Sequence, residues 1–193
     1  MKTTLYYSPG ACSLSVHITL IEKKLDFALK KVNLATHLTE DGVELATINP
    51  KNYVPVLVLA DGNVHTEVVA ILSSLENTEY KTIESLSFIS SELHKSFGPF
   101  FNKKTPEEYK VIAREKITNR FNYVEAVLSR SEYFNGSTYS ACDAYLFTIL
   151  RWLKLLKDTG LSIATWPTIT TYYDKIAQRP AVQAAIEVEH ISV

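Results

Sequence analysis

The residue best suited to take part in chemistry is Cys12, which follows a Ser-Pro-Gly-Ala turn near the amino end. A β-rich run from Thr3 to Tyr7 enters this turn, and a helix-like segment opens at Cys12 or Ser13. The first turn of a helix presents unpaired N–H groups and the positive end of the dipole, and both favour a thiolate. Cysteines placed this way can have pKa values one to several units below about 8.5. The pattern therefore predicts a redox or thiol-handling site.

The hydroxyl groups beside Cys12 could serve the same chemistry. Tyr7 or Ser13 could donate a hydrogen bond to a bound thiolate, and such charge-assisted bonds are about twice as strong as neutral ones. Each residue also has a structural interpretation. Cys12 could be a small buried hydrophobe, Tyr7 an aromatic residue on a buried strand, and Ser13 a helix cap. The helix-start position favours function for Cys12 and a supporting role for Ser13.

Composition narrows the class of protein. The chain has 193 residues, 46% of them hydrophobic, and a net charge of −1, so neither nucleic acid nor an anionic membrane is indicated as a partner. Its two cysteines, Cys12 and Cys142, are too few for a disulfide framework and have no metal-ligand spacing, so we expect no metal site. We find no signal peptide and no apolar run of about 18 residues, so a cytoplasmic protein is expected.

The hydrophobic pattern divides the chain into two parts. Strand and helix signals alternate over residues 1–76, including a weak helix signal over 40–48 and a hairpin formed by 54–59 and 64–66. From residue 80 to 193 the β signals vanish and apolar residues recur at helical spacing. The fold class predicted is therefore an α/β domain over 1–76 followed by an all-helical domain over 80–193.

Local signals predict where individual helices begin and end. Gly98-Pro99 should end the first helix of the second domain, and Thr105 should cap the next one. Ser140 and Asp143 have the spacing of a capping box at the start of a third helix. Cys142, within that first turn, is interpreted as a core residue.

Several motifs in register resemble the beta-class bacterial glutathione S-transferases. They occur in the family's order and cover nearly the whole chain. The motifs are Tyr6-Tyr7-Ser8-Pro9-Gly10-Ala11-Cys12-Ser13, Asn49-Pro50-Lys51-Asn52-Tyr53-Val54-Pro55, Thr66-Glu67, Glu92-Leu93-His94-Lys95 and Asp143-Ala144-Tyr145-Leu146-Phe147-Thr148.

The resemblance implies a thioredoxin-like N-terminal domain, a helical C-terminal bundle and a homodimer that binds glutathione at the domain boundary. It implies a cis Val54–Pro55 bond, with the Val54 backbone meeting the cysteinyl unit of glutathione. It also implies that Thr66, Glu67 and the helix N-terminus at Val68 hold the γ-glutamyl end. A proline inside a β-run fits an edge strand equally well, and Thr66 and Glu67 could simply begin a helix.

The resemblance further implies that His94 and Lys95 line the active cleft, where cationic neighbours would lower the pKa of a thiol. Without the family resemblance, a His-Lys pair would be interpreted as part of a solvated helix face.

The chain departs from the family pattern at several points. Relatives usually have Gly or Ser where this chain has Val68, so a hydroxyl contact to glutathione is lost. The family's basic residues after the second strand appear as His37-Leu38, and an Asn appears as Ser87. The linker of 76–79 is also shorter than is usual in the family.

The leading hypothesis is a detoxifying transferase that conjugates glutathione to small hydrophobic electrophiles. Glutathione is its co-substrate, and no other cofactor is expected. Two alternatives stay open. One is a non-catalytic binding or regulatory protein of the same fold, and the other is a glutathione-dependent disulfide reductase that uses Cys12.

Overall fold

The computed structural model describes residues 2–76 and 79–193. By internal contacts the chain forms two units, one comprising Met1–Thr78 with Arg179–Val193 and the other Glu79–Gln178. The last fifteen residues thus group with the first unit. The domain boundaries predicted from the sequence, 1–76 and 80–193, stay a prediction. The predicted short linker includes residues 77–78, which lie outside the described residues.

The first unit is built on a mixed β-sheet. In the part of the chain that the structure describes, its strand order is β3-β2-β1-β4-β5. Strand β1 is parallel to β2 and antiparallel to β4, and β5 pairs antiparallel with β4. The strands are rich in β-branched and aromatic residues, which pack well on a pleated surface. Their bounds are Thr3–Tyr7 (β1), Phe27–Asn33 (β2), Leu38–Thr39 (β3), Val56–Val58 (β4) and Val64–Thr66 (β5).

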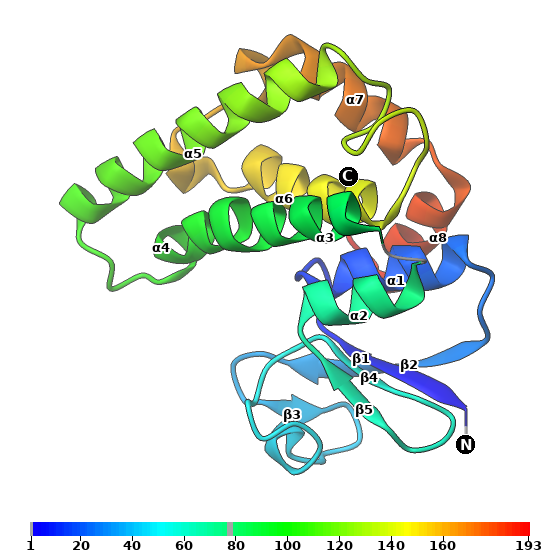
Figure 1. Ribbon diagram of the computed structural model, residues 1–193. Coiled ribbons are helices and arrows are strands. Elements are labelled where there is room, and N and C mark those ends of the chain that lie inside the picture. The colour runs from blue at the N-terminus through cyan, green and yellow to red at the C-terminus, as the bar shows by residue number, and fades with distance from the viewer. Residues whose placement is uncertain (1, 77–78) are drawn as a thin grey trace. The chain divides into compact units, whose positions relative to one another are not determined.

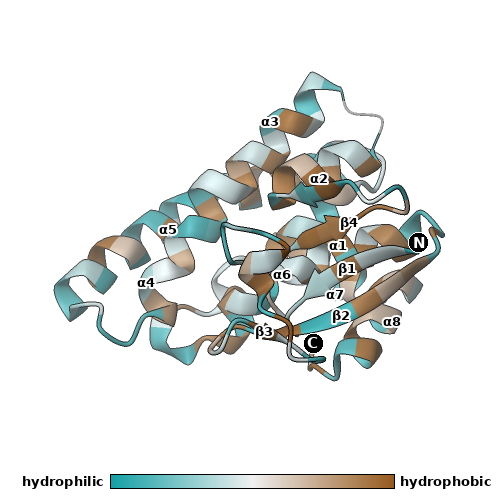
Figure 2. Cartoon of the chain, turned by 90° about the horizontal axis from the view of Figure 1, so that it is seen from below, coloured by the Kyte–Doolittle hydropathy of each residue, from teal (hydrophilic) through white to brown (hydrophobic). Residues whose placement is uncertain are grey.

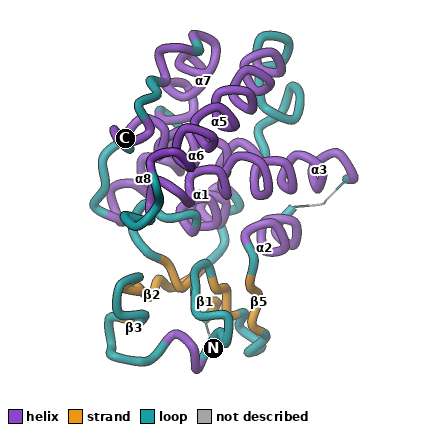
Figure 3. Tube along the Cα trace, turned by 90° about the vertical axis from the view of Figure 1, so that its left-hand side faces the viewer, coloured by secondary structure: helices purple, strands orange, loops and turns teal. Residues whose placement is uncertain are grey.

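Helices α1 (Ser13–Glu22) and α2 (Val68–Leu75) lie on the same face of this sheet (Figures 1 and 3). Figure 2 shows strong hydrophobic colour on β4 and α2, in keeping with their sequences VLV and VVAILSSL. Helix α8 (Pro180–Glu189) packs beside α1. These elements confirm the predicted α/β character of the first part, with the exception of the segment 40–48.

The segment 40–48 is not the helix that its sequence suggested. The chain forms the short strand β3 and then a 3-10 helix at Leu45–Thr47. Gly42 has a φ of +83°, where it turns the chain back so that its N–H donates to the Thr39 carbonyl. A left-handed residue cannot continue an α-helix, so the helix prediction is wrong here.

The second unit is helical. Its central helix is α6, whose residues from Ala141 to Leu153 are all buried. The α-helices are α3 (Tyr80–Phe88), α4 (Gly98–Phe101), α5 (Glu107–Leu128), α6 (Ala141–Leu155) and α7 (Pro167–Ala177). A π-helix (Ile89–Leu93) and a 3-10 helix (His94–Phe97) connect α3 to α4, and further 3-10 helices occur at Lys157–Thr159 and Ile163–Thr165.

The observed ends of the helices can be compared with the caps that the sequence predicted. The capping box is confirmed, because Ser140 Oγ accepts the Cys142 N–H and Asp143 Oδ2 accepts the Ser140 N–H at 2.8 Å. The prediction for Thr105 is wrong, since α5 follows Pro106 and has no side-chain cap. Gly98-Pro99 also begins a helix, α4, rather than ending one.

Candidate functional site

The sheet register brings three loops of the first unit together. Tyr6 pairs with Val56, and Val56 pairs with Thr66 on its other side. The loop after β1, the loop before β4 and the loop after β5 therefore meet at one end of the sheet. These loops carry Cys12, Val54–Pro55 and Glu67, so three predicted parts of the site lie together.

Cys12 occupies the N-cap position of α1. Its Sγ donates a hydrogen bond to the Val54 carbonyl, with the two atoms 3.5 Å apart. The Cys12 carbonyl in turn accepts bonds from the N–H and the hydroxyl of Ser15. The thiol is therefore fixed between the first turn of α1 and the loop before β4.

The pKa of the Cys12 thiol is raised, not lowered. Burial of the sulfur raises this pKa to about 12, and Glu67 adds to the increase, while the N–H groups of Cys12 and Ser13 lower it in part. A helix N-terminus contributes about 0.3–1 kcal/mol, less than one pKa unit, whereas the removal of water from the half-buried Cys12 sulfur raises the pKa by more. The predicted low thiol pKa is therefore wrong. At neutral pH Cys12 is a neutral hydrogen-bond donor.

Ser13 and Tyr7 have structural partners. Ser13 is fully buried, and its hydroxyl accepts the Ser8 N–H and donates to the Ser8 carbonyl, both at 3.2 Å. Tyr7 is buried, and burial, with a contribution from Glu189, raises the pKa of its phenol. The bonds of the Ser13 hydroxyl and the burial of Tyr7 favour the structural interpretation of both side chains, in which Ser13 closes the turn before Cys12.

The Val54–Pro55 peptide bond is cis, as the resemblance implied. Asn49 supports this loop, because its Nδ2 donates to the Tyr53 carbonyl at 2.9 Å and its Oδ1 accepts the Lys51 N–H at 3.1 Å. The loop thus has a defined backbone next to the Cys12 sulfur.

Glu67 lies at the N-cap of α2 with a φ of 72°, a conformation unusual for a non-glycine residue. Its Oε1 accepts bonds from Lys51 Nζ at 2.6 Å and Tyr53 Oη at 2.5 Å, and Lys51 Nζ also donates to Thr66 Oγ1 at 3.0 Å. Val68, the first residue of α2, is buried. The sequence analysis predicted Thr66, Glu67 and Val68 as site residues. It missed Lys51 and Tyr53, although both lie in the motif of residues 49–55.

A buried carboxylate from the end of the chain supports the Cys12 turn. Glu189 Oε2 accepts the Gly10 N–H at 2.8 Å, and its Oε1 lies 2.9 Å from His17 Nδ1. The side chains of His17 and Glu189 are 1% and 0% exposed. Because 179 residues separate Gly10 from Glu189, no sequence pattern indicated this contact.

In the second unit, His94 is held by aromatic residues of α6. Its Nδ1 lies 2.6 Å from Tyr145 Oη, and its ring packs against Trp152. Burial, with a smaller effect from Lys95, lowers the pKa of His94 to about 4. His94 is therefore neutral at pH 7, and the prediction of a cationic His94 is wrong. Lys95 is exposed.

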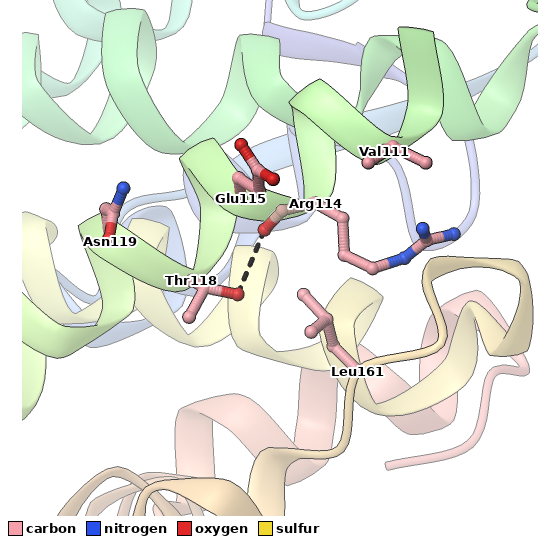
Figure 4. A pocket seen from close by; sticks show the side chains of 6 residues that line it. All are labelled: Val111, Arg114, Glu115, Thr118, Asn119 and Leu161. Carbon is pink, nitrogen blue, oxygen red and sulfur yellow. Dashed lines mark hydrogen bonds between the residues drawn. The ribbon is translucent and has the colours of Figure 1, made fainter. Parts of the chain in front are cut away.

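A cavity of about 570 Å³ lies beside α5 and contains none of the predicted site residues. Figure 4 shows the side chains that line it. Its one basic side chain, Arg114, donates to the Thr159 carbonyl and pairs with Glu107. The lining residues are Val111, Arg114, Glu115, Thr118, Asn119 and Leu161. Its cation is already bonded and the cavity brings together none of the residues predicted for the site, so it is not the candidate site.

Two negative findings concern the described residues only. Across 2–76 and 79–193, no three or more His, Cys, Asp or Glu side chains are grouped in a way that could hold a metal ion. Within the same ranges, no helix combines the length and apolar character needed to cross a membrane.

The family assignment comes from comparison with known proteins. Residues 10–78 match the model of the glutathione S-transferase N-terminal domain, and residues 88–180 match that of the C-terminal domain. The chain belongs to the glutathione S-transferase family. Its relatives include glutathione S-transferase GstA of Escherichia coli O157:H7, at 40% identity over 96% of this chain and 98% of that one.

Solved structures agree with this assignment. A sphingomonad glutathione S-transferase complexed with glutathione is 37% identical, with a TM-score of 0.92 over 98% of this chain and 100% of that one. The beta-class enzyme of Sphingomonas chungbukensis is 35% identical, with a TM-score of 0.91 over the same shares. The predicted resemblance to the beta class and the fold class, thioredoxin-like followed by helical, are confirmed.

Proposed function

We propose that this glutathione S-transferase family member transfers glutathione to small hydrophobic electrophiles. The observation that carries the proposal is the meeting of three loops at one end of the sheet, with Cys12, the Val54 backbone and Glu67 in one place. These groups offer a thiol, a backbone edge and a carboxylate. They match the cysteinyl thiol, the peptide backbone and the ammonium of an extended glutathione.

Glutathione would bind through its backbone and its γ-glutamyl end. The Val54 N–H and carbonyl would pair with the cysteinyl unit, in the manner of an added strand. Glu67 would receive the ligand ammonium, sharing its carboxylate with Lys51 and Tyr53. The N–H groups at the start of α2, beside Thr66 and Val68, would receive the carboxylate.

Cys12 would act as a donor to the sulfur of glutathione. Its neutral thiol already donates to the Val54 carbonyl, and a bound thiolate would be a stronger acceptor for the same proton. The thiolate then attacks the electrophile. For a chlorinated nitrobenzene, the C–S bond forms, chloride leaves with the C–Cl electron pair, and the thiol proton goes to solvent.

The family resemblance alone adds His94 and Lys95 of the second unit to the proposed residues. A homodimer in the cytoplasm is part of the same proposal, which rests on the family resemblance.

The thiol pKa weighs against disulfide reduction, because exchange needs a thiolate and proceeds best when the attacking thiol has a pKa near ambient pH. One contact favours the non-catalytic alternative. Lys51 already forms an ion pair with the Glu67 carboxylate, which would otherwise receive the ammonium of glutathione. Calorimetry with glutathione separates the readings, because millimolar or absent binding supports the non-catalytic protein.

The direct test is conjugation of glutathione with a chloronitrobenzene. The wild type should turn over above background. Cys12→Ala should lose roughly tenfold in kcat/KM, near the lower end of what a hydrogen bond to a charged group contributes. Cys12→Ser should retain more activity, because its hydroxyl still donates. Cys142→Ala is the matched control and should keep wild-type activity. Absent turnover together with absent glutathione binding would refute the proposal.

A further inference from the structure

The carboxylate proposed to receive the ligand ammonium already has a cation bound to it. Lys51 Nζ lies 2.6 Å from Glu67 Oε1 and also donates to Thr66 Oγ1 at 3.0 Å. Tyr53 Oη donates to the same Glu67 oxygen at 2.5 Å. The bond to Glu67 raises the pKa of Lys51, so this lysine is charged at neutral pH. Before any ligand binds, the negative charge of Glu67 is therefore compensated within the first unit.

A turn in the loop before β4 holds both donors near Glu67. Asn52, between Lys51 and Tyr53, has a φ of 60°, and its N–H donates to the Asn49 carbonyl at 2.8 Å. The buried Asn49 side chain accepts the Lys51 N–H and donates to the Tyr53 carbonyl. One buried side chain thus fixes the backbone on both sides of Asn52. The turn keeps Lys51 within reach of Glu67.

An incoming ammonium gains little at a carboxylate that is already paired. If the ligand displaces Lys51, one ammonium–carboxylate pair breaks while another forms, and the two contributions nearly cancel. If Lys51 stays in place, two positive charges lie next to one carboxylate and repel each other. A thiol peptide without the ammonium avoids both penalties, because Lys51 then keeps its bond to Glu67.

We propose that Lys51 is an internal counter-ion that sets the thiol specificity of this site, so that cysteinylglycine peptides whose N-terminal acyl group has no ammonium bind about as well as glutathione. The inference rests on the proposed function and widens its thiol substrate to acylated cysteinylglycine peptides. The proposed contacts with the Val54 backbone and with the start of α2 are the same for both kinds of ligand. Lys51 is therefore the residue that decides between them.

The size of the effect follows from the exposure of the pair. The side chains of Lys51 and Glu67 are 48% and 50% exposed, so water screens their attraction. Exposed ion pairs change an equilibrium constant by at most about fivefold. Removal of Lys51 should therefore restore a preference for the ligand ammonium of up to about fivefold.

Calorimetry on the whole protein can measure the two affinities. The ligands are glutathione and glutaryl-cysteinylglycine, which is glutathione with its α-ammonium replaced by hydrogen. The wild type should bind the two within about twofold of each other. Lys51→Met should bind glutathione about three- to fivefold more tightly, and the analogue no more tightly than the wild type does. Lys51→Arg keeps the charge and should keep the wild-type ratio of affinities.

Lys2→Met is the matched control. Lys2 is about as exposed as Lys51 and pairs with Asp26 at 2.6 Å. The two residues precede β1 and β2, so they lie at the opposite end of the sheet from the site, and both affinities should stay unchanged.

Two results would overturn the proposal. In the first, Lys51→Met loses affinity equally for both ligands, which would mean that Lys51 holds a carboxylate of the ligand. In the second, the wild type already prefers glutathione by about fivefold or more. In either case a wild type that binds and conjugates glutathione would keep the proposed function. A wild type that binds neither ligand would refute both the proposed function and the role of Lys51.

Discussion

Replacing Glu189 should destabilise the protein strongly, because this buried carboxylate meets a half-buried N–H and a buried imidazole. Its oxygens lie 2.8 Å from the Gly10 nitrogen and 2.9 Å from His17 Nδ1, and neither His17 nor Glu189 is exposed to solvent. Glu189→Ala removes the carboxylate that the half-buried Gly10 N–H and the buried His17 imidazole meet. Each unsatisfied group costs about 1–3 kcal/mol, and breaking a buried pair costs about 3–5 kcal/mol in total.

Glu189→Gln should be much milder. The amide oxygen can accept the Gly10 N–H, and the amide nitrogen can still meet His17 Nδ1. The expected loss is about 1–2 kcal/mol, the difference between a charge-assisted and a neutral hydrogen bond. Because Gly10 lies two residues before Cys12, the alanine variant should also raise the KM for glutathione.

Urea unfolding followed by circular dichroism measures the free energies. Glu187→Ala is the control, since Glu187 is exposed on the same helix and should change stability by less than about 0.5 kcal/mol. The reasoning is refuted if Glu189→Ala stays within about 1 kcal/mol of wild type, or if the glutamine variant is equally damaged.

Three further predictions concern single side chains. Asp143→Ala should lower the free energy of unfolding by about 3 kcal/mol, since its carboxylate accepts four buried or half-buried N–H and O–H bonds, and Ser140→Ala by about 1 kcal/mol. Lys51→Met should tighten glutathione binding in calorimetry, because Glu67 then meets the ligand ammonium without a competitor; weaker binding would contradict this. Unfolded His94 binds its proton near pH 6.5 and folded His94 only near pH 4, so wild-type stability should fall as pH drops between these values. His94→Gln should show a flatter pH profile of stability.

Local signals were sufficient for much of the fold. The β-rich run before a Ser-Pro-Gly turn located β1 and the start of α1, and the Ser140–Asp143 spacing located the start of α6. They failed at 40–48, where Gly42 adopts a left-handed conformation that the weak helical pattern does not reveal.

The sequence predicted the place of Cys12 at the start of α1 but not the protonation state of its thiol. Helix-start geometry is visible in a sequence, so Cys12 was found. Burial of the Cys12 sulfur depends on the tertiary fold, so the direction of its pKa shift could not be predicted from the sequence. The same reason applies to His94, whose partner Tyr145 lies 51 residues away, and to Glu189, whose contacts span most of the chain.

The most direct test of the account is the protonation state of Cys12 in the protein without ligand. Alkylation rates of Cys12 should be measured against pH, in a Cys142→Ala background. The neutral-thiol account predicts a slow reaction at pH 7 and a rise only well above pH 9, toward the pKa of about 12. A midpoint at or below about pH 8, as for an ordinary or activated thiol, would contradict it.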